Sequence, residues 1–428
     1  MPSKICIIGA GAAGLVTAKH AIKDGHQVEI FEQTDKIGGT WVYSEETGCH
    51  SSMYKTMKTN LPKQCLEFEN VPYTDGLPSF LPHENVLEYL ENYSKELSIF
   101  FNTKVTNVTR EEEQWKVTTS TNSAEFESIN YYDVVFVCNG HFFEPFNPFE
   151  NSGFVGEMLH SHDYRRAEHF EGKKVVIVGA GPSGIDITLQ VAMTARHVTL
   201  IGTHAVFPVV LPGTVRQIPT HVKNVYSEGV ITDEGENITA DVIIVCTGYK
   251  YKVFLDTGTA KKLSYFQFPF MDPSLIQLKH NSQIVSPLYQ HICHVDYPMT
   301  LFFIGLLHLA VTFPLFEVQA KYALSLVSRK GKLPSDIQNF EENRMKTAKS
   351  PRDFHVLVEE QWDYMKELAE MGGFEKLDRM EAIRKLFVYV VEEQKRNPIG
   401  YKMQNFEWND EDMEFRKIDS NCAVTLDK

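Results

Sequence analysis

Two patterns of apolar residues alternate along the chain. Short continuous runs rich in Val, Ile and Phe are typical of parallel strands that are covered on both faces. We predict such strands at residues 4–8, 28–32, 133–138, 175–178, 197–201, 241–246 and 301–305, and meander strands at 103–108 and 115–120. Apolar residues at helical spacing predict helices at 15–23, 84–95, 185–193, 314–328, 354–371 and 378–395. Strands that alternate with helices favour an α/β fold.

A glycine-rich turn follows two of the predicted strands. Gly9–Gly14 and Gly179–Gly184 both fit the pattern G-x-G-x-x-G. Glycines at this spacing allow a tight turn and bring backbone N–H groups close to a pyrophosphate at a helix N-terminus. One such pattern is a weak signal, but two predict two bound dinucleotides and electron transfer between them. The similarity of Asp133–Gly140 to Asp241–Gly248 supports two copies of one architecture.

The residue at the end of the next strand indicates which dinucleotide each turn would bind. Glu32 lies 18 residues after Gly14, where a carboxylate accepts hydrogen bonds from ribose hydroxyls and repels a 2′-phosphate. The first site is therefore predicted to bind FAD or NAD. Thr203 stands at the corresponding position of the second site, and the lack of a carboxylate there favours NADP(H). No Arg occupies that position, which leaves Thr203, His204 or the more distant Arg216 to contact the phosphate.

Two further segments carry groups that suit a flat ligand. Gly38 and Gly39 allow the main chain to pass against a ring system. Trp41 can form a wall of that site, although a core position is equally consistent with the sequence. Asn60 offers a donor and an acceptor in a polar segment that ends at Pro62, and the alternative for Asn60 is a turn or a cap.

Composition excludes several classes of partner. The 428 residues are 43% hydrophobic and 23% charged, as in a globular protein of two or more domains. The net charge of −14 argues against nucleic acid or an anionic membrane as a partner. The seven cysteines include no C-x-x-C pair, which argues against a zinc ribbon and favours a reducing compartment. His160 and His162 lack a third nearby ligand, so no metal is predicted.

The sequence shows no targeting or membrane-spanning segment. The first predicted strand begins a few residues after Met1, which leaves no signal peptide in the chain. The apolar stretch at residues 299–313 is interrupted by His308 and is shorter than the roughly 20 residues that span a bilayer. We expect a soluble, cytoplasmic protein. If a leader had been removed from the chain, the protein would be secreted. The N-glycosylation triplets at Asn92, Asn107 and Asn237 could be modified only in that case.

Together these features resemble the flavin-containing monooxygenases. Gly9–Gly14, Glu32 and Gly38–Trp41 are similar to the FAD site of that family. Lys58–Pro62 is similar to its Asn-bearing segment. The identifying fingerprint of the family, F-x-G-x-x-x-H-x-x-x-Y/W, lies between the two nucleotide sites and corresponds here to Phe154–Tyr164.

The resemblance extends through the second half of the predicted fold. Gly179–Gly184 is similar to the NADPH loop of the family, and Cys246–Tyr249 to its threonine-glycine turn. Pro314, Glu317 and Gln319 fall where the family closes over the flavin. The resemblance thus implies these cofactor-binding residues: Gly9, Gly11, Ala13, Gly14, Glu32, Gly39, Thr40, Trp41, Thr59, Asn60, Val105, Gly179, Gly181, Pro182, Ser183, Gly184, Thr203, His204, Thr247, Gly248 and Gln319.

The resemblance implies a monooxygenase that depends on FAD and NADPH. In this family NADPH passes hydride to FAD, and O₂ then adds to the reduced flavin. The resulting C4a-hydroperoxyflavin oxygenates a soft nitrogen or sulfur, as in a tertiary amine or a sulfide. Asn60 is the expected catalytic residue, hydrogen-bonded near the flavin C4a atom, where it holds oxygen or retained NADP⁺.

The expected α/β fold contains two Rossmann-like dinucleotide-binding domains and a helical carboxyl-terminal segment. We predict the first part of the FAD domain at residues 1–165, a smaller NADPH domain at 166–295, and a return to the FAD domain with the terminal helices at 296–428. The apolar tail of the vertebrate members is missing. The length and the net negative charge of the chain are most similar to those of insect members of the family, which include alkaloid N-oxygenases. The sequence leaves open whether the protein is a homo-oligomer.

Three other functions share part of this pattern. A Baeyer–Villiger monooxygenase has two Rossmann sites and a similar fingerprint, but Tyr164 stands where those enzymes typically have Trp. A flavin-dependent disulfide or quinone reductase is the second, and the lack of C-x-x-C excludes its disulfide version. The third is a non-catalytic flavin redox sensor, whose contact surface would be the carboxyl-terminal helices.

Overall fold

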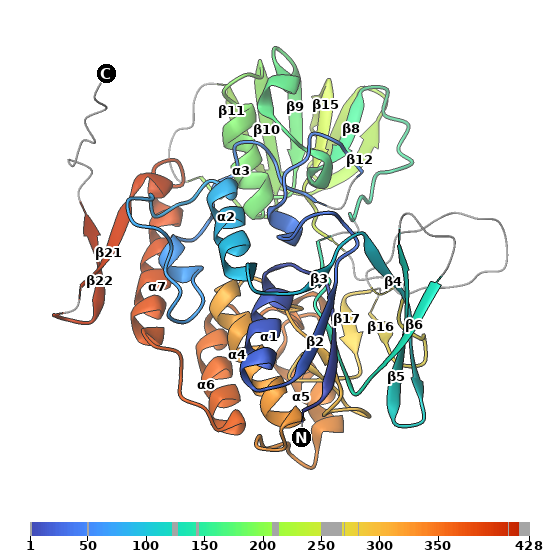
Figure 1. Cartoon of the computed structure of the whole chain (residues 1–428). Coiled ribbons are helices and arrows are strands. Elements are labelled where there is room, and N and C mark those ends of the chain that lie inside the picture. Colours follow the sequence, from blue (N-terminus) through green and yellow to red (C-terminus); the bar gives the residue numbers. More distant parts are fainter. Residues whose placement is uncertain are drawn as a thin grey trace.

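Two sheets of parallel strands organise the molecule. The computed structural model describes residues 2–48, 51–121, 127–142, 145–207, 214–249, 268, 270–280, 282–409 and 411–418. These residues form the α/β fold that the sequence predicts. The second sheet, with β8–β11 and β15, lies above the first in Figure 1, and helices α4–α7 lie beside the first.

The first sheet has seven strands in the order β18-β19-β20-β7-β1-β2-β3. The five strands from β20 to β3 are parallel, and β18 and β19 are antiparallel. The strands are β1 (Lys4–Ile8), β2 (Gln27–Phe31), β3 (Ile99–Phe100), β7 (Val134–Val137), β18 (Leu288–Tyr289), β19 (Cys293–His294) and β20 (Leu301–Phe303).

Alternate residues of β1 enter two hydrophobic cores. Ile5 and Ile7 belong to a core shared with the helices, whereas Cys6 and Ile8 belong to a core that contains the fully buried Trp115. The first core joins α1 (Ala12–Lys23), α2 (His83–Ser94), α4 (Thr312–Val327), α6 (Gln361–Gly372) and α7 (Met380–Arg396). The second core includes residues of the antiparallel strands β4 (Thr103–Glu111), β5 (Gln114–Thr121) and β6 (Glu127–Tyr132).

The second sheet repeats this arrangement. Its five strands are all parallel, in the order β11-β10-β9-β15-β8. Val175 and Ile177 pack with α3 on one face, and Val176 and Val178 pack with an antiparallel ribbon on the other. The elements are β8 (Glu157–His160), β9 (Lys174–Val178), α3 (Pro182–Val191), β10 (His197–Gly202), β11 (Val215–Pro219), β12 (Val222–Tyr226), β13 (Gly229–Thr232), β14 (Asn237–Thr239) and β15 (Val242–Val245).

The carboxyl-terminal third differs in detail from the sequence prediction. The helix predicted from residue 354 begins only at Gln361, because residues 351–353 and 358–360 form 3₁₀ turns and Val358 has a φ of 46°. The sequence did not reveal α5 (Phe340–Thr347), β16 (Gln277–Lys279), β17 (Ile284–Ser286) or the ribbon of β21 (Asn405–Asn409) and β22 (Glu414–Ile418). None of the described helices is long and apolar enough to cross a membrane.

Strand pairing divides the chain slightly differently from the predicted boundaries. β8 precedes residue 165 in the chain but pairs with β15 of the second sheet. β18 precedes residue 296 but belongs to the first sheet through β19. Both strands lie at sheet edges, where pairing between segments distant in sequence decides membership and the local pattern of apolar residues does not.

The two glycine turns have nearly identical geometry. Gly9 and Gly179 have φ values of 103° and 109°, in the region that favours glycine. A Cβ on Gly14 would lie 2.0 Å from the Gly9 carbonyl oxygen, and a Cβ on Gly184 would lie 1.9 Å from that of Gly179. The predicted structural repeat is confirmed at the level of single backbone contacts.

This close contact predicts different effects for two Ala substitutions in the second turn. Gly184→Ala should lower the free energy of unfolding by about 1–3 kcal/mol, because the new methyl group overlaps a main-chain carbonyl. Gly181→Ala is the matched control, because Gly181 has a φ of −78° and no atom lies within 4 Å of the place that its methyl group would take. Urea unfolding of both variants measures the difference. Equal stability of the two would contradict the proposed contact.

Candidate functional site

The first glycine turn lies directly against the Gly38–Trp41 segment. Gly38 donates its N–H to the Ala10 carbonyl oxygen at 3.0 Å, and its φ is 111°. A Cβ on Gly39 would lie 3.4 Å from the Gly11 Cα atom. The 3₁₀ helix η1 (Gly39–Trp41) is therefore held beside the N-terminus of α1.

Glu32 lies immediately after β2 and fixes the same turn. Its carboxylate is buried; Oε2 accepts the Ala10 N–H at 2.9 Å, and Oε1 accepts the N–H and the hydroxyl of Thr34 at 2.9 and 2.8 Å. A carboxylate has about four acceptor sites, so one acceptor position of Oε2 remains for a ribose hydroxyl. No side chain of the described residues caps α1, which leaves its first N–H groups for a pyrophosphate. These residues fit the adenosine diphosphate part of FAD.

Gln319 acts on this site through the main chain. It is fully buried in α4, where Oε1 accepts the Gly305 N–H at 3.1 Å and Nε2 donates to the Tyr364 hydroxyl at 3.0 Å. Gly305 has a φ of 88°, and a Cβ there would lie 3.5 Å from the Ala13 Cβ atom. Gln319 therefore positions the turn beside the start of α1, with both ends of its amide already engaged.

Asn60 follows a rigidly held residue. Thr59 is buried and pairs twice with Leu81: its N–H donates to the carbonyl oxygen at 2.9 Å, and its hydroxyl accepts the Leu81 N–H at 3.0 Å. Asn60 itself is half-buried, and its side-chain amide forms no hydrogen bond with another described residue. The segment thus presents an amide whose donor and acceptor are both available.

The remaining expected residues of the first site have different environments. Trp41 is half-buried and packs edge-to-face on Phe313, with ring centroids 6.4 Å apart, so it contributes to the core. Thr40 is exposed, and its carbonyl oxygen accepts the Ser51 hydroxyl at 3.2 Å. Val105 is buried in the second core of the first sheet, beside a β-bulge of β4.

The second glycine turn offers an equally open helix N-terminus. Among the described residues no side chain caps α3, whose first two residues are Pro182 and Ser183. A Cβ on Gly179 would lie 2.4 Å from the Cys246 carbonyl oxygen, so the turn is pressed against the end of β15. There Thr247 donates its hydroxyl to the Phe146 carbonyl oxygen, and Gly248 accepts the Phe146 N–H at 2.9 Å. This geometry fits the pyrophosphate of a second dinucleotide.

Thr203 and His204 lie just beyond the end of β10, whereas Arg216 does not. Thr203 and His204 are exposed, and their side chains are 3.1 Å apart between Oγ1 and Nδ1. Arg216 pairs in register with Thr199, near the opposite end of the strand, and its guanidinium is bound to Glu236 at 2.5 and 2.8 Å. Arg216 is thus too far from the end of β10 to contact the 2′-phosphate, which leaves Thr203 and His204 of the three residues considered.

The fingerprint segment joins the two halves of the molecule. A Cβ on Gly156 would lie 2.5 Å from the Asp241 carbonyl oxygen, which explains the glycine at this position. His160 is buried, and burial lowers its pKa to about 4, so it is neutral at pH 7. Its Nδ1 accepts the His162 N–H at 3.1 Å, so it acts as a structural acceptor. The fingerprint therefore shapes the chain between the two sites.

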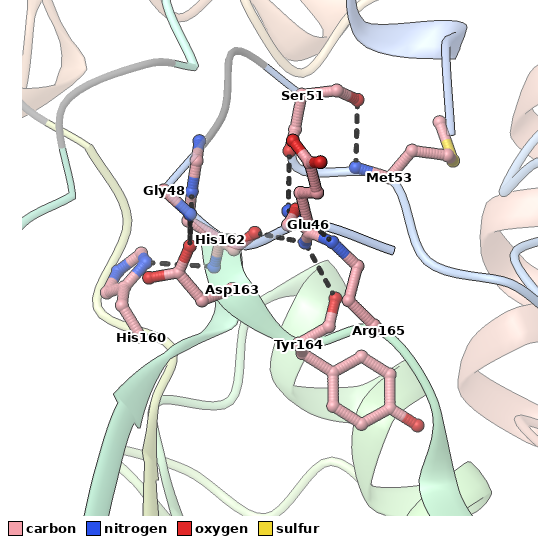
Figure 2. Close-up of polar contacts among 9 residues, drawn as sticks. All are labelled: Glu46, Gly48, Ser51, Met53, His160, His162, Asp163, Tyr164 and Arg165. Atoms are coloured by element: carbon pink, nitrogen blue, oxygen red, sulfur yellow. Dashed lines mark hydrogen bonds and ion pairs between the residues drawn. The ribbon is translucent and has the colours of Figure 1, made fainter. Parts of the chain in front are cut away.

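Arg165 is a structural residue that the sequence did not reveal. Arg165 is buried, and Figure 2 shows its side chain between the turn at His162–Tyr164 on one side and Glu46 and Ser51 on the other. It donates to the carbonyl oxygens of His162 at 2.7 Å, Glu46 at 2.8 Å and Ser51 at 3.2 Å. Beside it, Asp163 accepts the Gly48 N–H at 2.9 Å. The acceptors of Arg165 are main-chain carbonyl oxygens, and two of them lie 119 and 114 residues away in the sequence. No sequence motif therefore indicates these bonds.

Comparison with known proteins supports this description. The flavin-binding monooxygenase-like family model matches residues 2–210 and 204–378. The flavin-containing monooxygenase FMO GS-OX-like 6 of Arabidopsis thaliana is 32% identical over 418 residues, which cover 89% of this chain and 83% of the relative.

Two solved structures share the fold over nearly the whole chain. The S-allyl-L-cysteine S-oxygenase of Allium sativum has a TM-score of 0.84 and 30% identity, and the match covers 96% of this chain and 97% of that one. Tmm from Pelagibacter sp. strain HTCC7211 has a TM-score of 0.81 and 28% identity, with 96% of each chain covered. The match of the family model and these similarities lead to one conclusion. The chain belongs to the flavin-binding monooxygenase-like family.

Proposed function

We propose that the protein uses NADPH, FAD and O₂ to transfer one oxygen atom to a soft nitrogen or sulfur, as in a tertiary amine or a sulfide. The other oxygen atom leaves as water, and NADPH with one proton supplies the two electrons. The observation that carries the proposal is the pair of equivalent glycine turns, one beside the carboxylate of Glu32 and the other beside the neutral Thr203. FAD, when bound, supplies the acceptor for the hydride and the carrier for oxygen.

In the proposal, each of the two sites binds one cofactor. The sheet of β1 holds FAD, with its pyrophosphate at the start of α1 and its ribose at Glu32. The sheet of β9 holds NADPH, with its pyrophosphate at the start of α3. Asn60 is the catalytic residue, because its half-buried amide, which binds no other side chain or main-chain group of the described residues, can donate to and accept from groups beside a flavin ring. The fixed position of Thr59 keeps this amide from moving away.

Two features support oxygen transfer to nitrogen or sulfur. One similar protein is named as an S-oxygenase, of S-allyl-L-cysteine. The fingerprint ends in Tyr164, whose buried hydroxyl donates to Gln190 Oε1 at 3.2 Å, a bond that the Trp typical of Baeyer–Villiger enzymes would lack. Both a tertiary amine and a sulfide remain within the proposed substrate class.

The test combines coenzyme consumption with product analysis. The FAD-loaded protein is given NADPH, ¹⁸O₂ and either a tertiary amine or a thioether, and products are identified by mass spectrometry. Incorporation of one ¹⁸O into an N-oxide or S-oxide is expected. Conversion of a cyclic ketone to a lactone, with amines and sulfides unchanged, would overturn the proposal, as would NADPH oxidation that yields peroxide alone.

Replacement of Asn60 should separate NADPH oxidation from oxygen transfer. We expect Asn60→Ala to keep FAD but to form product on the order of 10²-fold more slowly, with NADPH wasted as hydrogen peroxide, because one preorganised hydrogen-bonding group is lost. The measurement is the ratio of peroxide released to NADPH consumed. Asn92→Ala, an exposed substitution on α2, is the matched control and should leave the ratio unchanged. The same ratio in Asn60→Ala and the parent would remove Asn60 from the mechanism.

A carboxylate at position 203 should reverse coenzyme preference. Thr203→Glu is expected to raise the KM for NADPH roughly fivefold relative to that for NADH, because two like charges about 4 Å apart repel by about 1 kcal/mol even in water. Thr239→Glu adds the same charge at an exposed position of β14 and serves as the control. Steady-state kinetics with both coenzymes gives the ratio. No change in that ratio would place the 2′-phosphate elsewhere.

A further inference from the structure

A largely buried ion pair lies between the two candidate sites. Lys402, in the 3₁₀ helix η8 (Tyr401–Met403), donates to Asp186 Oδ1 at 2.9 Å. The two side chains are only 14% and 17% exposed. The other carboxylate oxygen of Asp186 accepts the Tyr54 hydroxyl, and it also accepts the Gln190 amide at 2.9 Å. The carboxylate is thus bound by one group of its own helix and by two groups from segments that are distant in sequence.

The same cluster holds the main chain that leads to Asn60. Lys402 also donates to the Lys58 carbonyl oxygen at 3.0 Å, two residues before Asn60. Thr56 donates its hydroxyl to Gln190 Oε1 at 2.6 Å. The segment at residues 54–58 is therefore fixed on one side by α3 and by the carboxyl-terminal segment, and Thr59 is fixed on the other side by Leu81.

The position of Asp186 on its helix links this cluster to the second glycine turn. Asp186 lies one helical turn after Pro182, the first residue of α3. The N-terminus of this ten-residue helix is the place proposed for the coenzyme pyrophosphate. A helix of this length moves as one body, so the distance from the bound coenzyme to the segment at residues 54–60 depends on the bonds made by Asp186.

A purely stabilising role would not require these charges. Burial removes both groups from water, and a buried ion pair can often be replaced by apolar residues without loss of stability. A charged pair does fix a geometry, however, because each partner has hydrogen-bonding directions that must all be satisfied. Lys402 uses two such directions at once, one toward α3 and one toward the main chain of Lys58.

We propose that Asp186 and Lys402 are positioning residues that set the place of Asn60 relative to the coenzyme bound at α3. This inference rests on the proposed function, since it assigns the bonds of the cluster to the alignment of the two sites. Lys402 connects the carboxylate on α3 to the segment that carries Asn60. Loss of Lys402 would leave Asp186 and the Lys58 carbonyl oxygen without this shared donor, so the end of the segment next to Asn60 would be held less firmly, although Tyr54 and Thr56 still bind α3.

Hydrogen–deuterium exchange and coupling measurements together test this inference on the FAD-loaded protein. Lys402→Met should increase amide exchange in residues 54–60 and raise the peroxide released per NADPH several-fold. Lys402→Arg, which keeps the charge and the donors, should restore both values toward those of the parent. Lys395→Met is the matched control: Lys395 is paired with Glu392 at the same 2.9 Å distance, but on the exposed surface of α7.

Each outcome decides for or against the inference. Unchanged exchange in residues 54–60 and unchanged coupling in Lys402→Met would overturn it, as would equal effects of Lys402→Met and Lys395→Met. Failure of Lys402→Arg to recover coupling would also count against it. The parent protein separates the two hypotheses: a parent that forms no oxygenated product refutes the proposed function, whereas the exchange measurement reports on the position of the segment without any turnover.

Discussion

The contact between each glycine turn and the carbonyl that ends a neighbouring strand is the constraint on which the rest of the structure depends. Gly9 lies against the Cys138 carbonyl oxygen and Gly179 against that of Cys246, at distances that leave no room for a side chain. The turn must therefore be tight, and the helix after it must start at the edge of the sheet. This places two open helix N-termini, each able to bind an anion, at the carboxyl ends of parallel strands in two sheets.

Two binding sites are useful for electron transfer only if their relative position is defined. Two separate sets of polar contacts connect the two halves of this protein. Arg165 joins the fingerprint turn to the segment that follows Gly38–Trp41, through main-chain carbonyl oxygens. Asp186 and Lys402 join α3 to the segment before Asn60. Because polar bonds have defined directions, they fix an orientation that apolar packing alone leaves less specific.

The sequence predicted those parts of the site in which local backbone geometry demands a residue type. The glycines of both turns, the acid at Glu32 and the glycine pair at Gly38–Gly39 are of this kind, and the structure brings the first turn, Glu32 and the glycine pair together around Ala10. Gln319 was found in the sequence through a family resemblance, but its contact with Gly305 was not. Arg216 was considered for the phosphate because distance along the chain does not show which end of a strand a residue occupies.

The sequence by itself determined the fold class, the two dinucleotide folds and the difference in charge between Glu32 and Thr203. These follow from short-range rules, since strand burial, turn geometry and the residue at a strand end are encoded within about thirty residues of a βαβ unit. Tertiary structure alone decided that β8 joins the second sheet, that Arg165 links the halves, and that Lys402 reaches Asp186 across 216 positions of sequence. Such contacts depend on which distant surfaces meet when the sheets and helices pack, and a single sequence carries no local pattern for that.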